Sequence, residues 1–318
     1  MLARSLSKKW RDARQDLRRR VAMRFIGDRD YLARLHRAKL GIWPDLDEPR
    51  SFNEKILVKM LRDRRPMLTL FSDKLRVREY VRRTAPGLRL PALYWWSGRA
   101  EALPFEALPD AFALKANHGS GWNCLVGNKA DFSRSQLVRV GKRWLRSDFT
   151  IVGREWAYRH IRRALYAEEL LCGEGGSTPA DYKLFVFRGR VRLIQVDRDR
   201  FGRHTQVLHD PQWNLIPGTV AAQQGEPIEP PGTLAAMISA AEALSGGVDF
   251  LRVDLYDIRG SACFGELTCS PNKGLSPFRP RSLDTLLGSW LELDDYSQPG
   301  RIGYDPDAFA EAGELASR

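Results

Sequence analysis

The hydrophobic pattern of the chain is clearest at residues 252–268, where apolar and polar residues alternate on both sides of an Asp/Arg/Gly turn. This period of two predicts an antiparallel hairpin with one buried face and one polar face. We expect a three-residue loop at 259–261 to connect its strands. The same pattern predicts a second hairpin at 181–197, with Asp181 and Lys183 on one face. The polar faces of these two hairpins are therefore the first places to look for chemistry.

Charged side chains follow the polar face of the first hairpin. The expected register pairs Asp254 with Glu266 and places Arg252 opposite Thr268. Two facing carboxylates repel one another unless a cation lies between them, and Mg²⁺ is commonly held by one or two carboxylates together with a substrate phosphate. The pair predicts a magnesium site. A solvated hairpin face without a function is the alternative that this segment alone leaves open.

Helical spacing of apolar residues predicts most of the remaining elements. Ser51 followed by Glu54 is a capping-box pattern that begins a helix. The next helix is expected over 68–82, with Asp73, Lys74, Arg76 and Arg78 on its solvent side. Further helices are predicted at 133–145, 234–244 and 283–291, and a strand at 90–96.

A glycine-rich segment follows a short apolar run that ends in Lys115. The next residues include His118, Gly119, Ser120 and Gly121. Glycines let backbone N–H groups approach an anion, and the lysine supplies a point charge, so the segment is typical of phosphate binding. It lacks the Gly-Lys-Ser/Thr of a Walker A motif, and a flexible hairpin turn is the alternative for the segment taken by itself.

Composition is that of an ordinary globular protein. The chain has 318 residues, of which 43% are hydrophobic and 28% charged, so we expect two or three packed lobes. It has no apolar run that could span a bilayer and no apolar secretory segment near its start, which predicts a cytoplasmic protein. Four cysteines without a Cys-x-x-Cys pair argue against a zinc site or a disulfide framework.

The net charge of +12 is concentrated in the first 24 residues. Residues 1–26 have the pattern of a basic amphipathic helix, which could rest on anionic lipids of the inner leaflet, bind a glycosyltransferase partner, or pack on its own domain. Clustered Lys and Arg are also the footprint of nucleic-acid binding. No recognition motif and no stacked aromatic residues follow the basic run, so nucleic acid is the weaker hypothesis.

Short motifs occur in a fixed order along residues 50–280: Phe52-Asn53-Glu54-Lys55, Asp73-Lys74, Leu114 to Gly121, Ala167-Glu168-Glu169, Asp181-Tyr182-Lys183, Gln195 to Phe201, Arg252 to Tyr256 and Phe264 to Thr268. In this order they resemble the ATP-grasp superfamily, and within it the teichuronopeptide-biosynthesis-like (TupA-like) branch. The resemblance implies an α+β fold in which two lobes with antiparallel sheets clasp ATP. The expected divisions are a basic helical region (1–48), a preceding helical and α/β lobe (49–110), a small ATP-grasp subdomain (111–171) and a large one (172–318).

The resemblance implies ATP and Mg²⁺ as cofactors. Carried over by position, Lys115 would contact the α- and β-phosphates, the loop 118–121 would close over the β- and γ-phosphates, and Lys183 would be a second phosphate contact. Glu168 would accept from the adenine amino group, and the backbone of 169–171 would complete the hinge. The residues assigned to the nucleotide are Lys115, His118, Gly119, Ser120, Gly121, Glu168, Glu169, Leu171, Asp181 and Lys183.

The same resemblance assigns Asp254 and Glu266 to Mg²⁺. Many ATP-grasp enzymes have an asparagine two residues after this glutamate, whereas this chain has Thr268. Thr268, Asn272 or a water molecule would complete the metal shell, which leaves the number of Mg²⁺ ions open. Arg252 resembles the arginine that acts on the developing oxyanion. The catalytic set implied is Arg252, Lys183 and Arg200.

The implied reaction activates a carboxylate by γ-phosphoryl transfer and then joins it to an amine. The branch implies a uronic-acid-containing polysaccharide or its precursor as one substrate and an amine or amino acid as the other. Arg200, Arg203 and His204 could meet the acid, or could form a solvated basic loop. Two other functions stay open, a phosphotransferase that acts on a sugar hydroxyl and a non-enzymatic nucleic-acid-binding or scaffold protein.

Overall fold

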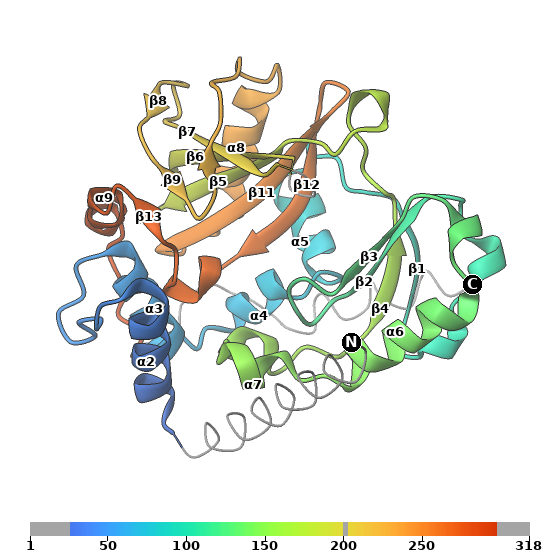
Figure 1. Cartoon of the computed structure of the whole chain (residues 1–318), viewed down its shortest axis with the longest axis horizontal. Coiled ribbons are helices and arrows are strands. Elements are labelled where there is room, and N and C mark those ends of the chain that lie inside the picture. Colours follow the sequence, from blue (N-terminus) through green and yellow to red (C-terminus); the bar gives the residue numbers. More distant parts are fainter. Residues whose placement is uncertain (1–25, 200–202, 298–318) are drawn as a thin grey trace, which may run out of the picture.

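The computed structural model of the protein describes residues 26–199 and 203–297. The basic helix predicted at the N-terminus and Arg200 lie outside the described residues. Two mainly antiparallel sheets organise the rest (Figure 1), and the helices α4 (Pro66–Ser72) and α5 (Val77–Thr84) lie between them in this view. The fold is α+β, as the sequence predicted.

The smaller sheet has four strands in the order β1-β4-β2-β3. Its strands are β1 (Leu93–Ser97), β2 (Phe112–Ala116), β3 (Asn123–Val126) and β4 (Leu165–Glu168). Helix α6 (Arg134–Arg146) packs on one face, where its residues Leu137 and Trp144 join the core formed by Phe112 and Leu114. Ser133 caps this helix through a capping box with Gln136.

The larger sheet runs in the order β10-β7-β6-β5-β11-β12, with β8 beside β7. Its strands are β5 (Asp181–Phe187), β6 (Arg190–Arg198), β7 (Thr205–His209), β8 (Leu215–Ile216), β10 (Gln223–Gln224), β11 (Phe250–Ile258) and β12 (Ser261–Thr268). A separate two-stranded ribbon joins β9 (Thr219–Val220) to β13 (Phe278–Arg279). Both hairpins predicted from the alternating pattern are present, as β5–β6 and β11–β12.

Helices cover both faces of the larger sheet. On one face, α4, α5 and α8 (Leu234–Leu244) bury residues such as Leu184 and Val253. On the other face, α2 (Asp28–Leu40), α3 (Phe52–Arg62) and α9 (Ser282–Trp290) bury Phe185 and Phe250. The remaining helical segments are α7 (Phe149–Gly153) and the 3₁₀ turns η1 (Ala100–Ala102), η2 (Phe105–Ala107), η3 (Lys129–Asp131), η4 (Trp156–Tyr158), η5 (Glu174–Gly176) and η6 (Pro271–Gly274).

Because side chains alternate along a strand, the face that carries Phe185 and Phe250 also carries Lys183 and Asp254. The aromatic end of this face is sealed by α3 and α9. The polar end faces the smaller sheet. One strand surface therefore serves as hydrophobic core at one end and as candidate site at the other.

The turn of the β11–β12 hairpin differs from the prediction, although the register agrees with it. Ile258 pairs with Ser261, so the connection is a two-residue turn of Arg259 and Gly260, both at positive φ. A bulge after Asp254 supplies the extra residue that restores the Asp254–Glu266 pairing. The extra residue is Gly265, where a side chain would begin only 2.8 Å from the backbone oxygen of Asp254.

The helix predicted over 68–82 is broken into α4 and α5. Asp73 ends α4 and accepts hydrogen bonds from the backbone N–H groups of Leu75 and Arg76 and from the amide of Asn117. Asp73 and Arg78 are buried, at 3% and 5% exposure, so the prediction that they face solvent is wrong. Local periodicity missed this because their partners lie on other elements.

The expected lobe at 49–110 is not a separate unit among the described residues. Its helix α3 packs on α9 and the larger sheet, and α4 and α5 cover that sheet's opposite face. Strand β1, which we placed in the same lobe, pairs with β4 of the smaller sheet. The segment is thus divided between the two sheets instead of preceding them.

Candidate active site

A cavity of about 480 Å³ lies between the two sheets. The smaller sheet contributes Lys115 and Glu168 to its wall, and the larger sheet contributes Asp181, Asp254 and Glu266. The volume is within the range of pockets that hold small molecules and cofactors. The structure therefore places the predicted phosphate lysine and the predicted metal carboxylates around one space.

Arg252 lies at the centre of the acidic end. Its guanidinium donates to both oxygens of Asp254, at 2.6 and 2.7 Å, and to Thr268 Oγ1 at 3.1 Å. Glu266 Oε1 is 3.5 Å from Arg252 Nη2, and its Oε2 is 3.4 Å from Lys74 Nζ. Cations therefore balance the carboxylate pair that the sequence assigned to a metal.

Lys183 is buried behind this pair, at 5% exposure. Its ammonium contacts Asp181, lies 3.0 Å from Asp197 Oδ2 and lies 3.7 Å from Asp254 Oδ2. Asp197 is also 3.1 Å from His204 Nε2. The described cavity wall includes Asp181 but not the Lys183 side chain. Lys183 therefore contacts three carboxylates behind the cavity wall. The sequence had instead led us to expect a contact between Lys183 and a phosphate.

The two carboxylates of the pair differ in acidity. Burial raises the pKa of Asp254 to about 6, although Arg252 and Lys183 oppose this rise. Burial would also raise the pKa of Glu266, but Lys74, Arg252 and Lys183 outweigh it and bring the value to about 2. Asp254 is the more buried of the two, and Glu266 reaches the cavity with 36% of its side chain exposed. The site thus combines Glu266, whose lowered pKa keeps it ionised, with Asp254, whose raised pKa shows that its negative charge is less well stabilised.

The pair meets the requirements for Mg²⁺. The described residues include no group of three or more His, Cys, Asp or Glu side chains that could bind a metal by themselves. Mg²⁺ does not need such a group, since one or two carboxylates, waters and substrate phosphates commonly complete its octahedron. Asp254 and Glu266 supply two carboxylates on the cavity wall, with the Thr268 hydroxyl adjacent. The donor set suits Mg²⁺ that arrives with a nucleotide.

The opposite wall carries a second set of ion pairs. Glu168 accepts from Lys115 Nζ at 2.6 Å and from Arg78 Nη1 at 3.1 Å. Lys115 remains partly exposed to the cavity, whereas Arg78 is buried. The backbone N–H of Glu169 donates to Ala92 O, and the wall continues through Leu170 and Leu171. The predicted hinge segment therefore lines the cavity beside Glu168.

The glycine-rich loop divides into two halves. Ser120 and Gly121 line the cavity. His118 turns away, since the residue is only 3% exposed and its ring nitrogens lie 3.1 Å from the carbonyl of Trp144 and 3.2 Å from the side chain of Asn117. Burial lowers the pKa of His118, which keeps the imidazole neutral. Its side chain anchors the loop within the smaller lobe.

A second cavity, of about 620 Å³, adjoins the first through Ser120 and Glu266. Arg252, Thr268 and Asn272 form part of its wall, beside Glu155 and Lys273. Ser270 Oγ donates to Glu155 at 2.8 Å, and Lys273 Nζ lies 4.0 Å from the same carboxylate. Burial raises the pKa of Glu155 although Lys273 and Ser270 oppose the rise.

Sequence reasoning missed Lys74, Arg78 and Glu155 as site residues. Lys74 and Arg78 were assigned to the solvent side of a helix, although Lys74 belongs to the Asp73-Lys74 motif. Glu155 lies just before η4 in a segment without a periodic pattern, so no sequence signal pointed to it. Of the basic loop, Arg203 and His204 line a third cavity.

Comparison with known proteins identifies relatives of the chain. The sequence model of the TupA-like ATP-grasp family matches residues 54–292. No curated protein is similar to the chain at a significant level. The described residues contain no helix long and apolar enough to cross a membrane.

Similar solved structures include three ligases. The ATP-grasp ligase PsnB, complexed with a minimal precursor, Mg and ADP, is 15% identical over 64% of this chain and 52% of that one, with a TM-score of 0.38. D-alanine–D-alanine ligase from Bacillus anthracis, complexed with ATP, is 15% identical over 64% and 55%, with a TM-score of 0.38. The L-amino acid ligase from Bacillus licheniformis is 15% identical over 73% and 53%, with a TM-score of 0.45. The match spans about half of each of these chains.

Proposed function

The chain belongs to the TupA-like ATP-grasp family, and from this premise we propose that it is an ATP-dependent ligase that joins a carboxylate to an amine. ATP and Mg²⁺ are its cofactors, as the sequence led us to expect. The observation that carries the proposal is the cavity between the sheets, with Lys115 on one wall and Asp254 and Glu266 on the other.

In the proposed first step, a substrate carboxylate oxygen attacks the γ-phosphorus of ATP, and the bond to the β-phosphate oxygen breaks. The products are an acyl phosphate and ADP. Phosphoryl transfer needs positioning and charge neutralisation more than a covalent nucleophile. Lys115 and the Ser120–Gly121 backbone would orient the phosphates, and Asp254 and Glu266 would hold Mg²⁺, which offsets the charge of the phosphate oxygens.

In the proposed second step, the amine attacks the acyl carbon and phosphate leaves with the electrons of the broken C–O bond. Arg252 lines both the acidic end of the site and the second cavity, where it would stabilise the oxyanion. The amine must lose a proton. Among the described residues, the wall of the second cavity has two carboxylates, Glu266 and Glu155. We assign that proton to Glu155, because its raised pKa favours proton uptake.

The acid that we propose is a uronic-acid-containing polysaccharide or its precursor, and the amine is an amino acid or another small amine. The support is the family and the basic side chains near the second cavity, Lys39 and Lys273 among them. Attachment to the inner face of the plasma membrane, or to a glycosyltransferase, belongs to the same proposal. It rests on the basic sequence of residues 1–24.

Hydroxylamine trapping tests the reaction. The protein is incubated with Mg·ATP, hydroxylamine and single uronic acids, oligogalacturonate or amino acids, and hydroxamate and ADP are measured. A hydroxamate formed together with ADP supports the acyl phosphate. A stable phosphosugar without hydroxamate would instead identify a phosphotransferase.

The role of Glu155 has its own test in the same assay. Glu155→Gln is expected to keep hydroxamate formation, because hydroxylamine is mostly unprotonated at neutral pH and attacks without first losing a proton, which water can accept afterwards. Transfer to an alkylamine should fall by about 100-fold, the lower range for loss of a general base. Equal losses with both nucleophiles would remove Glu155 from the proposal.

A further inference from the structure

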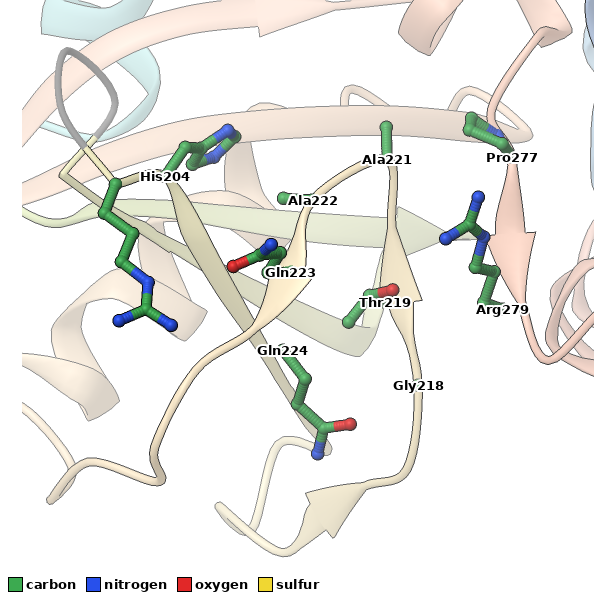
Figure 2. A pocket seen from close by; sticks show the side chains of 10 residues that line it. His204, Gly218, Thr219, Ala221, Ala222, Gln223, Gln224, Pro277 and Arg279 are labelled. Atoms are coloured by element: carbon green, nitrogen blue, oxygen red, sulfur yellow. The ribbon is translucent and has the colours of Figure 1, made fainter.

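A third cavity, of about 750 Å³, opens on the larger lobe (Figure 2). His204 and Arg279 lie on the two sides of the Ala221–Ala222 connection between β9 and β10. Thr219 and the amide side chains of Gln223 and Gln224 complete most of the polar wall. The walls therefore combine polar and small apolar side chains, and they come from segments that lie far apart in the sequence.

The cavity is positively charged. Arg203 and Arg279 are exposed, and neither forms an ion pair with a carboxylate in the described part of the chain. No Asp or Glu occurs among the described residues of the wall. By contrast, the cations described around Glu168 and around the Asp254–Glu266 pair are matched by carboxylates. Two arginines without carboxylate partners favour binding of an anion, because a guanidinium forms paired hydrogen bonds with a carboxylate.

The wall that presents Arg279 is held by close backbone contacts. Arg279 pairs with Thr219 across the β13–β9 ribbon. Gly218, at φ 135°, approaches so closely that a side chain there would begin 2.5 Å from the carbonyl oxygen of Arg279. Gln206 accepts from the backbone N–H of Val220 at 2.9 Å, which ties β9 to the main sheet. The groove is therefore fixed to the sheet that carries Asp254.

Two connections link this cavity to the reaction site. Ala221 and Pro277 line both this cavity and the second cavity, which reaches Arg252 and Glu266. In addition, His204 contacts Asp197, and Asp197 contacts Lys183, which lies 3.7 Å from Asp254. A long substrate could thus extend from the phosphate site into the third cavity.

We propose that the third cavity is a binding subsite for units of an acidic polysaccharide beyond the unit that reacts, with Arg203 and Arg279 on their carboxylates. The inference rests on the proposed function for the identity of the reacting group. Thr219, Gln223 and Gln224 match sugar hydroxyls, because a hydroxyl or an amide can both donate and accept. An acidic peptide would use the same two arginines, but a sugar chain offers more hydroxyl groups to Thr219, Gln223 and Gln224. The enzyme is therefore selective for chain length.

The test is calorimetric binding of oligogalacturonate to the full chain without ATP, so that it does not depend on turnover. The trimer is expected to bind about tenfold more tightly than the monomer, a difference of about 1.4 kcal/mol. The methyl-esterified trimer, which has lost its charge, should bind as weakly as the monomer. The double variant Arg203→Gln/Arg279→Gln should lose the preference for the charged trimer.

Arg192→Gln is the control, because Arg192 is an exposed arginine of β6 that lies outside the cavity wall. It should bind the trimer within about twofold of the parent. If Arg192→Gln lost as much affinity for the trimer as the double variant, general charge attraction would explain the binding and the proposal would be overturned. If the parent bound oligoglutamate as tightly as the galacturonate trimer, the occupant of the cavity would be an acidic peptide and not a sugar chain. If the trimer did not bind at all, the cavity would not be a subsite. Hydroxamate formation with single uronic acids would survive that last result, so failure of the subsite is distinguishable from failure of the ligase proposal.

Discussion

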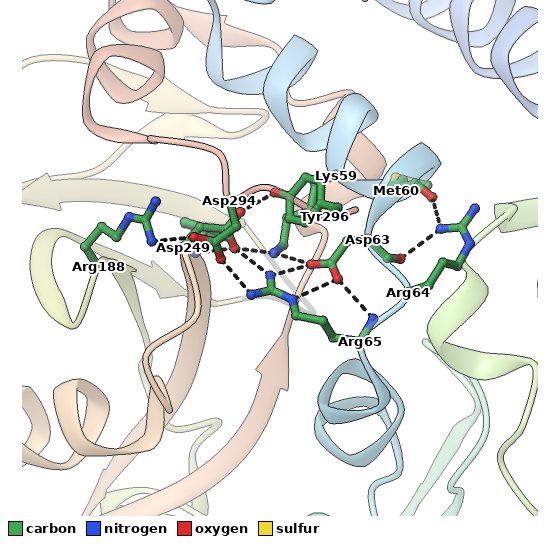
Figure 3. A network of polar contacts seen from close by, with 10 residues as sticks. Lys59, Met60, Asp63, Arg64, Arg65, Arg188, Asp249, Asp294 and Tyr296 are labelled. Carbon is green, nitrogen blue, oxygen red and sulfur yellow. Dashed lines mark hydrogen bonds and ion pairs between the residues drawn. The ribbon is translucent and has the colours of Figure 1, made fainter. Parts of the chain in front are cut away.

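Two clusters of ion pairs involve aspartates that lie five residues apart, one just before strand β11 and one within it. Asp249 directly precedes β11 and contacts Lys59, Arg65 and Tyr296 (Figure 3). Asp63 completes this Asp249 cluster, at 2.9 Å from Lys59 Nζ. Asp254 lies within β11 and belongs to the site cluster with Arg252, Lys183 and Glu266. Both clusters pair carboxylates with cations, yet their surroundings differ.

The Asp249 cluster is closed, whereas the site cluster borders a cavity. Lys59, Asp63 and Asp249 are each at least 98% buried. Their cations outweigh burial and lower the pKa of both Asp63 and Asp249. In the site cluster, burial raises the pKa of Asp254 to about 6 despite two adjacent cations. Within the site cluster this raised pKa is confined to Asp254, because the pKa of Glu266 is lowered to about 2. We infer that the closed cluster holds the fold, and that a cavity beside a carboxylate with a raised pKa marks the binding site.

The largest effect that we expect is a loss of stability when Asp249 of the closed cluster is replaced. Asp249→Asn should lower the free energy of unfolding by about 3–5 kcal/mol, because it leaves excess positive charge in a closed interior. Urea denaturation measures this change. Asp294→Asn is the control, since Asp294 pairs with Arg65 at 2.6 Å but is 20% exposed, and its loss should be smaller. Equal losses in both variants would break the distinction between closed and open clusters.

The second largest effect that we expect is a loss of stabilisation by Mg·ATP when Glu266 of the site cluster is replaced. At 100 times the dissociation constant, Mg·ATP should raise the free energy of unfolding of the parent by about 2.7 kcal/mol. Glu266→Gln should remove most of this gain while changing the ligand-free stability by about 1 kcal/mol or less, because water reaches this carboxylate. Denaturation with and without Mg·ATP gives both quantities. A Glu266→Gln protein that keeps the full gain would show that Mg·ATP does not use this carboxylate.

A smaller effect is expected on the opposite wall of the cavity. Lys115→Met should weaken nucleotide binding by about tenfold, which corresponds to about 1.4 kcal/mol for the lost charged contact. Lys142→Met is the control, because Lys142 pairs with Glu101 at 2.7 Å on the outside of the same lobe. Calorimetric titration of ADP with Mg²⁺ measures both variants. Equal affinities in the two variants would remove Lys115 from the phosphate site.

The smallest effect is a pH dependence of opposite sign in the two clusters. An aspartate has a pKa of about 3.9 in an unfolded chain. The lowered pKa of Asp249 gives stability that is present above this value and is lost as pH falls through the folded pKa. The raised pKa of Asp254 gives a penalty that is full above about 6 and is relieved as pH falls towards 3.9.

Unfolding free energies of variants measured in EDTA test these signs. Between pH 7 and 5 the parent should gain about 1 kcal/mol relative to Asp254→Asn. Below about pH 4 the advantage of the parent over Asp249→Asn should shrink. Parallel curves for the parent and Asp254→Asn would show that the pKa of Asp254 is not raised.

Local patterns in the sequence were enough to predict both hairpins and the Asp254–Glu266 pairing. The pairing came out correctly even though the loop was assigned wrongly, because the bulge at Gly265 offsets the shorter turn. Helix α8 also begins and ends at the predicted residues. These features depend on period and turn chemistry, which neighbouring residues encode.

Long-range contacts were not predictable in the same way. Arg78 reads as a surface residue of a helix, yet it is buried against Glu168, 90 positions further along the chain. The Asp249 cluster joins α3 to the start of β11, and no motif marks it. Glu155 becomes part of the site only because Ser270 and Lys273 fold against it. Such pairs require the tertiary fold, which periodicity does not specify.

The most direct test of the nucleotide and metal site is anomalous diffraction from crystals grown with Mn²⁺ and a non-hydrolysable ATP analogue. We expect a manganese peak between the carboxylates of Asp254 and Glu266, bridged to phosphates that lie beside Lys115. A nucleotide bound outside the cavity between the sheets, or a metal bound to it without either carboxylate, would show that this site assignment is wrong.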